Sequence, residues 1–352
     1  MKRASSRRTF LRNAAALALF AFAPLSARAA DPDFRARATN AWRGRIRSIL
    51  AKGELPIIDT EVTYNTSYDL DFILRNMDAL NVAQICPAPA GQLGSGASLE
   101  LYTRHPEYFI PTTTDGSSPH WYRDTQGFAA QLQRDLGSGH YFLMGEFELR
   151  HYPSPNQYRA GRLDRDVTVP LDDPGVRAVF QLAERTGIAL QIHYEIEDAL
   201  LPALESLLER HPRAKVIWCH LGQVRYPDRS TRYGPAYVRE LIKRFPNLYF
   251  DLGLPGPPHV HPASRARDQM IYTFTGYRPW GGFLRREWRE LLEDSAERFL
   301  AASDIGGDRF REFPDQILRL RQLVLNELSP RAQHLIAYQN AWRLITGERW
   351  ES

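Results

Sequence analysis

Short apolar runs rich in β-branched and aromatic residues alternate with longer amphipathic segments from residue 55 onward. In segments such as 176–185 and 200–210, Leu, Ala and Val recur at the spacing of one helix face, and charged residues occupy the other face. This alternation predicts repeated βα units and a parallel sheet. The eight apolar runs that we expect to be strands span residues 55–62, 82–86, 108–112, 141–149, 188–194, 215–220, 248–252 and 299–304.

Eight units in one chain predict an α/β fold of the closed (β/α)₈ type, a TIM barrel, at residues 55–348, with 30–54 as an N-terminal lead-in. An open dinucleotide-binding sheet is disfavoured because no G-x-G-x-x-G turn follows the first run. Two insertions interrupt the pattern, at 150–172 after the fourth strand and at 253–282 after the seventh. Both follow the carboxyl ends of strands, where such barrels build their active sites.

The first 29 residues differ from the rest of the chain in their charge and apolar pattern. Arg7-Arg8 is followed by an uncharged apolar run and then by small residues that end in a cleavage site just before residue 30. The segment resembles a twin-arginine signal peptide, which implies delivery of the folded protein to the bacterial periplasm by the twin-arginine export machinery. The apolar run has only about 12 residues, so we expect no membrane span in the mature protein.

The composition is that of a soluble globular protein, with 43% hydrophobic and 24% charged residues. The formal net charge of +4 comes from the leader, which holds six basic residues and no acidic ones. The remaining chain has 39 basic and 41 acidic residues. This balance excludes the basic surface typical of a nucleic-acid-binding protein, and we expect a small-molecule substrate instead. Cys86 and Cys219 fall in separate strands, too far apart to bridge, so we expect two buried free thiols.

Acids and imidazoles occur at or near the carboxyl ends of five predicted strands. Because side chains alternate between the two faces of a strand, one set of positions faces the barrel interior, and Trp218 falls in this set. Nitrogen and oxygen donors around an open position are what a catalytic divalent metal requires. Each residue alone is compatible with a structural role such as a buried ion pair, but together they predict a shared site. The residues that we expect at this rim are Glu61, Glu146, His193, His220 and Asp304.

Five short motifs follow one another in the order of the predicted strands. They are IIDTEVT at 57–63, QIH at 191–193, WCHLG at 218–222, ASD at 302–304 and NAWRL at 340–344. This series resembles the amidohydrolase superfamily, specifically the amidohydrolase-related (amidohydrolase 2-like) group of metal-dependent TIM-barrel hydrolases, over about residues 55–348. The resemblance implies that a metal-activated water attacks an amide, ester or lactone carbonyl. It also implies that His193 is a metal ligand, His220 a ligand or electrophile, and Asp304 a ligand and proton shuttle.

The first motif departs from the H-x-H of that superfamily, because it reads Glu61-Val62-Thr63. Glu61 can bind a cation through a carboxylate oxygen, and Glu146 can add a second, but Thr63 is a poor ligand. We therefore expect one divalent metal ion, Zn²⁺, Mn²⁺ or another, held more weakly than by H-x-H. The literal H-x-H of this chain, at 259–261, lies in the second insertion, where we expect a loop or substrate-contact role.

The sequence is compatible with three functions. A metal-dependent hydrolase fits best. A non-oxidative decarboxylase or lyase is the first alternative, because the aromatic-acid decarboxylases of the superfamily use E-x-H at strand one. A catalytically degenerate binding protein is the second, because H-x-H is lost. The arginines of the insertions are suited to an anionic group, and the residues that we expect to contact substrate are Arg150, Trp218, Glu195, Tyr277 and Arg278.

Overall fold

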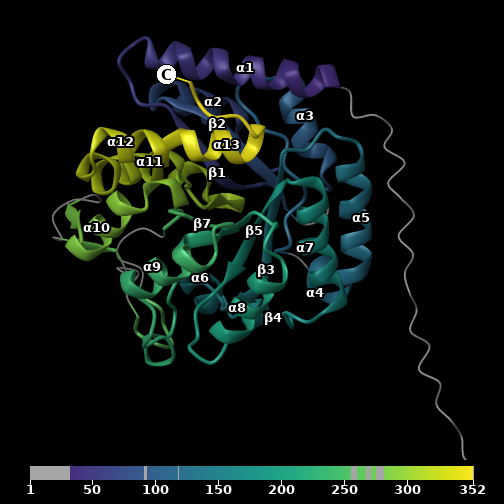
Figure 1. Ribbon diagram of the computed structural model, residues 1–352, viewed down its shortest axis with the longest axis vertical. Coiled ribbons are helices and arrows are strands. Elements are labelled where there is room, and N and C mark those ends of the chain that lie inside the picture. The colour runs from purple at the N-terminus through teal and green to yellow at the C-terminus, as the bar shows by residue number, and fades with distance from the viewer. Residues whose placement is uncertain are drawn as a thin grey trace, which may run out of the picture.

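The computed structural model describes residues 32–90, 93–117, 119–254, 260–266, 271–274 and 281–351. The expected signal peptide lies outside the described residues. The strands alternate with helices along the chain (Figure 1). They are β1 (Ile57–Tyr64), β2 (Val82–Pro89), β3 (Leu143–His151), β4 (Val167–Thr168), β5 (Ala189–Tyr194), β6 (Val216–Trp218), β7 (Leu248–Asp251), β8 (Tyr272–Phe274), β9 (Gly282–Leu284), β10 (Phe299–Leu300) and β11 (Ile305–Gly306).

The strands at the centre of the molecule run parallel and close into a barrel. One group has the order β11-β1-β2 and the other β10-β7-β6-β5-β3, with β4 added antiparallel to β3. Isolated bridges at Phe109 and Thr112 connect β2 to β3 through the third apolar run. On the opposite side, the backbone N–H of Thr60 donates to the carbonyl of Ala301, 3.1 Å away, between β10 and β11. The expected (β/α)₈ fold is therefore confirmed, although the segment expected to be its third strand, 108–112, forms only isolated bridges.

Helices cover the outside of the barrel, and α5 and α7 lie side by side on one flank (Figure 1). The lead-in forms a long helix, α1, at the end where β2 begins. There, Trp42 Nε1 donates to the carbonyl of Phe109 at 3.1 Å, and Arg45 Nε donates to that of Ala83 at 2.9 Å. The opposite end, where the strands finish, is left for the loops. The helices are α1 (Pro32–Leu50), α2 (Leu70–Ala79), α3 (Gly96–Arg104), α4 (Pro119–Arg123), α5 (Thr125–Gly137), α6 (Pro155–Arg159), α7 (Pro174–Thr186), α8 (Leu201–Arg210), α9 (Pro235–Arg244), α10 (Arg286–Asp294), α11 (Phe313–Leu323), α12 (Pro330–His334) and α13 (Asn340–Thr346).

Helix α7 illustrates how the sequence fixes these elements. Asp173 caps its first turn by accepting the N–H of Gly175 at 2.7 Å, and Pro174 occupies the first helical position. Gly187, at φ 69°, ends the helix in a left-handed conformation that favours glycine. The buried residues recur every three or four positions and pack against the core; they include Val176, Val179, Phe180 and Ala183.

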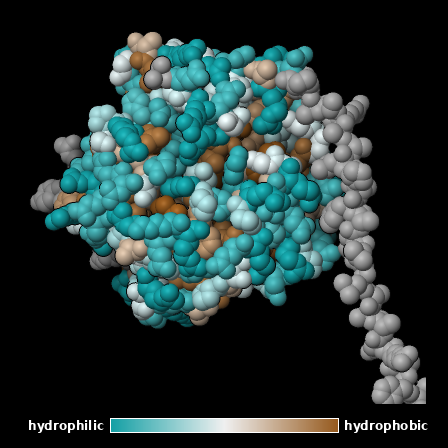
Figure 2. All heavy atoms as spheres, viewed as in Figure 1, coloured by the Kyte–Doolittle hydropathy of each residue, from teal (hydrophilic) through white to brown (hydrophobic). Residues whose placement is uncertain are grey.

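Both predicted insertions are present. The first contains α6 and β4, and the second contains the β8–β9 hairpin. Cys86 and Cys219 are buried free thiols, as expected. Within the described residues, no helix is both long and apolar enough to cross a membrane. One face of the molecule is mainly hydrophilic, with hydrophobic residues in scattered patches (Figure 2).

The structure corrects the expected position of Trp218. Strand β6 ends at this residue, two positions earlier than predicted. The indole Nε1 donates to the carbonyl of Tyr194 at 2.9 Å, and the ring packs against Phe250 and Tyr233. Cys219 is the residue that reaches the polar interior, next to acids of other strands. The alternation rule assigned Trp218 to the interior face of the barrel, and this prediction is wrong. The rule fails because the backbone leaves the extended conformation directly after this residue.

Candidate functional site

The acids and imidazoles assigned to one rim come together at the carboxyl ends of the strands. Glu61 lies on β1, Glu146 on β3 and His193 on β5, and His220 follows β6. His220 Nε2 is 3.2 Å from Glu61 Oε1 and 3.1 Å from Glu146 Oε1. His193 Nδ1 is 2.7 Å from the same Glu146 oxygen. Four of the five expected residues therefore share one buried cluster.

A left-handed turn after β6 brings His220 into this cluster. The φ angle is 56° at His220 and 50° at Leu221, a conformation that costs roughly 1–3 kcal/mol for each non-glycine residue. Asp251, at the end of β7, holds the turn by accepting the backbone N–H of His220 at 2.8 Å. His220 Nδ1 donates to the carbonyl of Gly253 at 2.9 Å, so Nε2 is the nitrogen that faces the carboxylates. A histidine fixed in this way by a backbone carbonyl is typical of metal sites.

His193 contacts a carboxylate through each ring nitrogen. Nδ1 binds Glu146, and Nε2 lies 3.3 Å from Glu195 Oε1. Burial alone would lower the pKa of His193, but the hydrogen bonds to these two carboxylates outweigh it and raise the pKa to about 10. Burial would likewise raise the pKa of Glu146, but its bonds to His193 and His220 hold that pKa well below the usual value. In the absence of a cation, two positively charged imidazoles and the Glu146 carboxylate therefore stabilise one another, since the pKa of His220 is likewise raised, to about 9.

Glu61 lies in the cluster without hydrogen bonds of its own. Both Oε atoms are buried and unpartnered, since the Nε2 proton of His220 is directed at Glu146, and Asp251 Oδ2 is unpartnered too. Burial, and then the negative charges of Asp251 and Glu146, raise the pKa of Glu61 well above its usual value. Buried carboxylate oxygens without partners are costly, and a cation between them would remove that cost.

The donor atoms fit a divalent metal ion. Imidazole nitrogens and carboxylate oxygens are ordinary ligands of Zn²⁺ and Mn²⁺, and the excess of carboxylates favours ions that prefer oxygen. Within the described residues, the groups whose donor atoms lie within 4.8 Å of one another are Glu146–His193–His220, His151–His193–Glu195, Glu61–His220–Asp251 and Glu61–Glu146–Cys219.

Asp304 lies at the edge of this cluster. Its backbone is also left-handed, at φ 51°, and its Oδ2 is 4.0 Å from His220 Nδ1. Arg309 donates to the Asp304 carbonyl at 2.5 Å and to Oδ1 at 3.4 Å. The side chain of Asp304 is 32% exposed, against 5% for Glu61, so this carboxylate borders both the donor groups and solvent.

A second polar layer adjoins the cluster and carries its own positive charges. Glu195 Oε1 is 3.2 Å from Arg225 Nε, and Glu148 forms an ion pair with Arg165 of the first insertion. Burial would raise the pKa of Glu195, but the hydrogen bond from His193 and the charge of Arg225 lower it to about 2. Each of these two acids is therefore paired with an arginine of the protein.

The residues expected to contact substrate occupy different environments. Arg150 is 7% exposed and forms ion pairs with Asp166 at 2.6 Å and Glu197 at 3.0 Å, which tie β3 to the first insertion and to the loop after β5. Glu195 lies against His193, as described above. Trp218 is packed away from the donor groups, between the strands and Tyr233.

The second insertion is described only in part. Tyr277, Arg278 and His259 lie outside the described residues. His261 is 2% exposed, and its Nε2 is 3.2 Å from the carbonyl of Pro153 in the first insertion. This histidine therefore joins the two insertions rather than the donor groups.

The sequence analysis did not predict three residues of the site, namely Asp251, Cys219 and His151. Asp251 ends β7 and could have been found, because it follows the rule that identified the other acids. Cys219 was assigned to the opposite face of its strand by alternation. His151, whose pKa burial lowers to about 3, ends β3 beyond the predicted strand and carried no signal that separates it from a loop residue.

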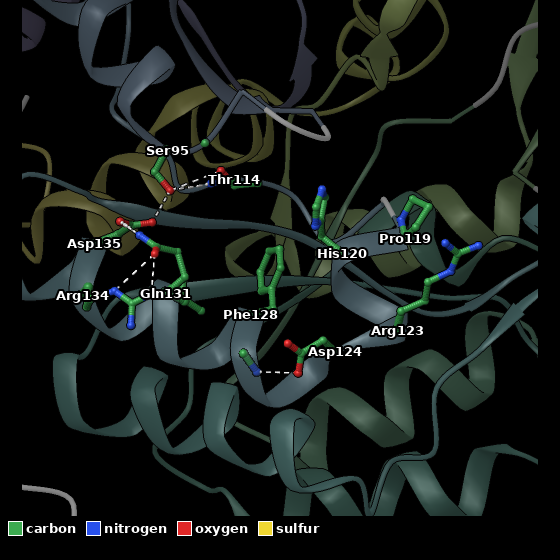
Figure 3. Close-up of a pocket in the computed structure, with 13 residues that line it drawn as sticks. Ser95, Thr114, Pro119, His120, Arg123, Asp124, Phe128, Gln131, Arg134 and Asp135 are labelled. Atoms are coloured by element: carbon green, nitrogen blue, oxygen red, sulfur yellow. Dashed lines mark hydrogen bonds between the residues drawn. The ribbon is translucent and has the colours of Figure 1, made fainter.

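A surface cavity of about 1110 Å³ lies elsewhere, between the start of α3 and helices α4 and α5 (Figure 3). Its polar groups are largely engaged with one another. Asp135 accepts a hydrogen bond from Ser95 at 2.7 Å, Gln131 binds Arg134, and Asp124 caps α5. We place the functional site at the strand ends rather than in this cavity. Of these two places, only the strand ends have buried carboxylate oxygens without hydrogen-bond partners.

A (β/α)₈ barrel with imidazoles and carboxylates at its strand ends defines a class of barrels equipped to bind a metal. Residues 121–346, more than half of the chain, match the family described as amidohydrolase. The chain therefore belongs to the amidohydrolase family. No curated protein matches the sequence.

The solved structures that resemble this chain are distant from it in sequence. An uncharacterized TIM-barrel protein from Bordetella bronchiseptica is 15% identical, with a TM-score of 0.52, and the match covers 84% of this chain and 100% of that one. A 2,6-dihydroxybenzoate decarboxylase is 14% identical, covering 83% and 98%, with a TM-score of 0.49. An amidohydrolase from Burkholderia multivorans with bound zinc is 14% identical, covering 83% and 99%, with a TM-score of 0.48. These likenesses concern the fold alone.

Proposed function

We propose that this protein is an exported metal-dependent hydrolase that adds water to the carbonyl of a small amide, ester or lactone. The observation that supports the proposal is the convergence of Glu61, Glu146 and His220 around buried carboxylate oxygens that have no hydrogen-bond partner. A buried arrangement of this kind is costly unless a cation compensates it. Membership of the amidohydrolase family supports the same chemistry.

Each residue has a definite part in this proposal. Glu61, Glu146, His193 and His220 would hold one divalent ion, which lowers the pKa of water toward neutrality and polarises a carbonyl. Asp304 accepts the proton of the attacking water and passes it to the leaving group, a role that suits a carboxylate open to solvent on one side. The backbone carbonyl of Gly253 keeps Nε2 of His220 directed at the reacting centre.

The test combines metal content with a substrate panel. The purified protein is expected to carry about one divalent ion per chain and to hydrolyse at least one member of a panel of esters, lactones and amides. Asp304→Asn should lower kcat by roughly 10²–10⁴-fold while the protein stays folded. Absence of metal after reconstitution, together with no hydrolysis, would refute the proposal.

A decarboxylase is the second candidate, favoured by a carboxylate, Glu61, at the end of β1 in place of an imidazole. It would use the ion to hold a substrate carboxylate, and His220 to deliver a proton. Aromatic acids belong in the same panel for this reason. Release of CO₂ from one of them, without hydrolysis of any carbonyl substrate, would replace the hydrolase with this alternative.

Export through the twin-arginine machinery rests on the sequence of the leader. The expected location is the periplasm. In a bacterial host, the wild-type chain should be recovered in the periplasmic fraction, and a chain with R7K and R8K together should stay in the cytoplasm. Equal recovery of both chains in the periplasm would contradict this part of the proposal.

A further inference from the structure

We propose that Asp251 is an additional ligand of the metal ion, so that the ion lies toward the β1–β7 side of the site, near Glu61, His220 and Asp251. The inference rests on the proposed function, because it specifies where the ion of that function binds. It gives a catalytic part to a strand that the sequence did not connect with the site.

The two oxygens of Asp251 have different surroundings. Oδ1 accepts the backbone N–H groups of His220, at 2.8 Å, and of Gly253, at 3.1 Å. Oδ2 is buried and accepts no hydrogen bond from a nitrogen or hydroxyl donor, while the Glu61 carboxyl and the Cys219 thiol lie beside the Asp251 carboxylate. Oδ1 therefore stabilises the turn that carries His220, while Oδ2 remains available as a metal ligand next to Glu61.

Asp251 and Glu61 together with His220 form a compact donor set. One ligand atom from each lies within 4.8 Å of the others. Metal–ligand bonds of about 2.0–2.2 Å place neighbouring ligand atoms roughly 3–4 Å apart, so only small side-chain movements are needed. A Cβ at residue 253 would lie 2.5 Å from Glu61 Oε2, so glycine at this position leaves space for the carboxylate to turn.

The distribution of charge distinguishes this set from its neighbour. The group formed by His151, His193 and Glu195 borders the guanidinium of Arg225, which already neutralises Glu195. Within the part of the chain that the structure describes, neither Glu61 nor Asp251 forms an ion pair with a lysine or arginine. A divalent cation is therefore stabilised by Glu61 and Asp251, whereas next to Glu195 it would be repelled by Arg225.

The experiment measures Mn²⁺ binding to the full mature chain by the electron paramagnetic resonance signal of the free ion. Asp251→Asn keeps an oxygen for the two backbone N–H groups but replaces the unpartnered oxygen with an amide. We expect it to weaken Mn²⁺ binding by 10-fold or more, with circular dichroism unchanged. Asp59→Asn is the matched control: Asp59 is equally buried on β1, but Ser303 donates to both of its oxygens. This variant should bind Mn²⁺ within about twofold of wild type.

The outcomes separate the two proposals. If Glu61→Gln loses Mn²⁺ while Asp251→Asn binds it like wild type, the inference is overturned and the proposed metal enzyme stands. If wild type itself binds no Mn²⁺, both fail. Asp251→Cys serves where the asparagine variant does not fold. A thiolate at residue 251 should abolish Mn²⁺ binding and add a thiolate-to-cadmium absorption band when Cd²⁺ is supplied, and absence of that extra band overturns the inference.

Discussion

Replacing Gly253 with alanine tests the geometry of the site with one added methyl group. The new Cβ would lie 2.5 Å from Glu61 Oε2, roughly 1 Å closer than ordinary van der Waals contact, and 3.3 Å from the Cβ of Ala302. Residue 253 is not in the left-handed region, so alanine adds no backbone strain there. The contact must therefore be relieved by movement of the Glu61 carboxylate.

The magnitude follows from this displacement. Adding a methyl group to a well-packed interior costs about 1–3 kcal/mol in the free energy of unfolding. A ligand displaced by about 1 Å should weaken metal binding by about 10–100-fold, comparable to the loss of an orienting contact. Isothermal titration with Mn²⁺ gives the affinity, and thermal unfolding of the metal-free protein gives the stability.

Gly44→Ala is the control, because nothing lies within 4 Å of a Cβ built at this exposed position of α1. In a helix interior, alanine in place of glycine should add up to about 1 kcal/mol of stability, and metal affinity should not change. If Gly253→Ala binds Mn²⁺ as tightly as wild type, Glu61 does not bind the ion from the position described here.

Three further predictions concern the buried charges. Glu195 has a pKa of about 2 in the folded protein against an ordinary 4.5, which corresponds to about 3 kcal/mol of stability; this is present above pH 4.5 and is lost as the pH falls toward 2. Glu195→Gln should therefore be less stable than wild type at pH 7 in urea titrations, by a difference that shrinks below pH 4.5. Arg165→Met leaves Glu148 buried without its partner and should cost about 3–5 kcal/mol by the same assay, and an unchanged midpoint would contradict the ion pair. Removal of the metal with EDTA should lower Tm, and added Mn²⁺ should restore it; a Tm indifferent to both would argue against a resident ion.

The barrel was predictable because its pattern repeats along the chain. The same unit, an apolar run followed by an amphipathic segment, recurs along the chain, so an error in one unit does not alter the fold that eight units define. The run at 108–112 shows the limit of this signal. It is apolar and rich in residues that favour strands, yet it forms only isolated bridges. Whether a strand forms a regular hydrogen-bond ladder depends on both of its neighbouring strands.

The site was predictable within the strands and obscure where they end. Glu61, Glu146 and His193 face inward as alternation requires. The two-residue period fails at Trp218 and Cys219, because the chain turns left-handed at His220, and no residue in that segment signals such a turn. The part played by Asp251 in supporting the turn is a contact between distant parts of the chain, which periodicity cannot reveal.

The single oxygen of Glu146 that contacts both His193 and His220 has a consequence for mutagenesis. Both imidazoles hydrogen-bond to Glu146 Oε1, so the position of each ring depends partly on the hydrogen bond that the other ring makes to this oxygen. The losses of activity measured for His193→Ala and for His220→Ala should therefore not add up to the loss of activity in the double variant. Apportioning catalytic power between these histidines will require the complete thermodynamic cycle, since neither acts as an independent unit.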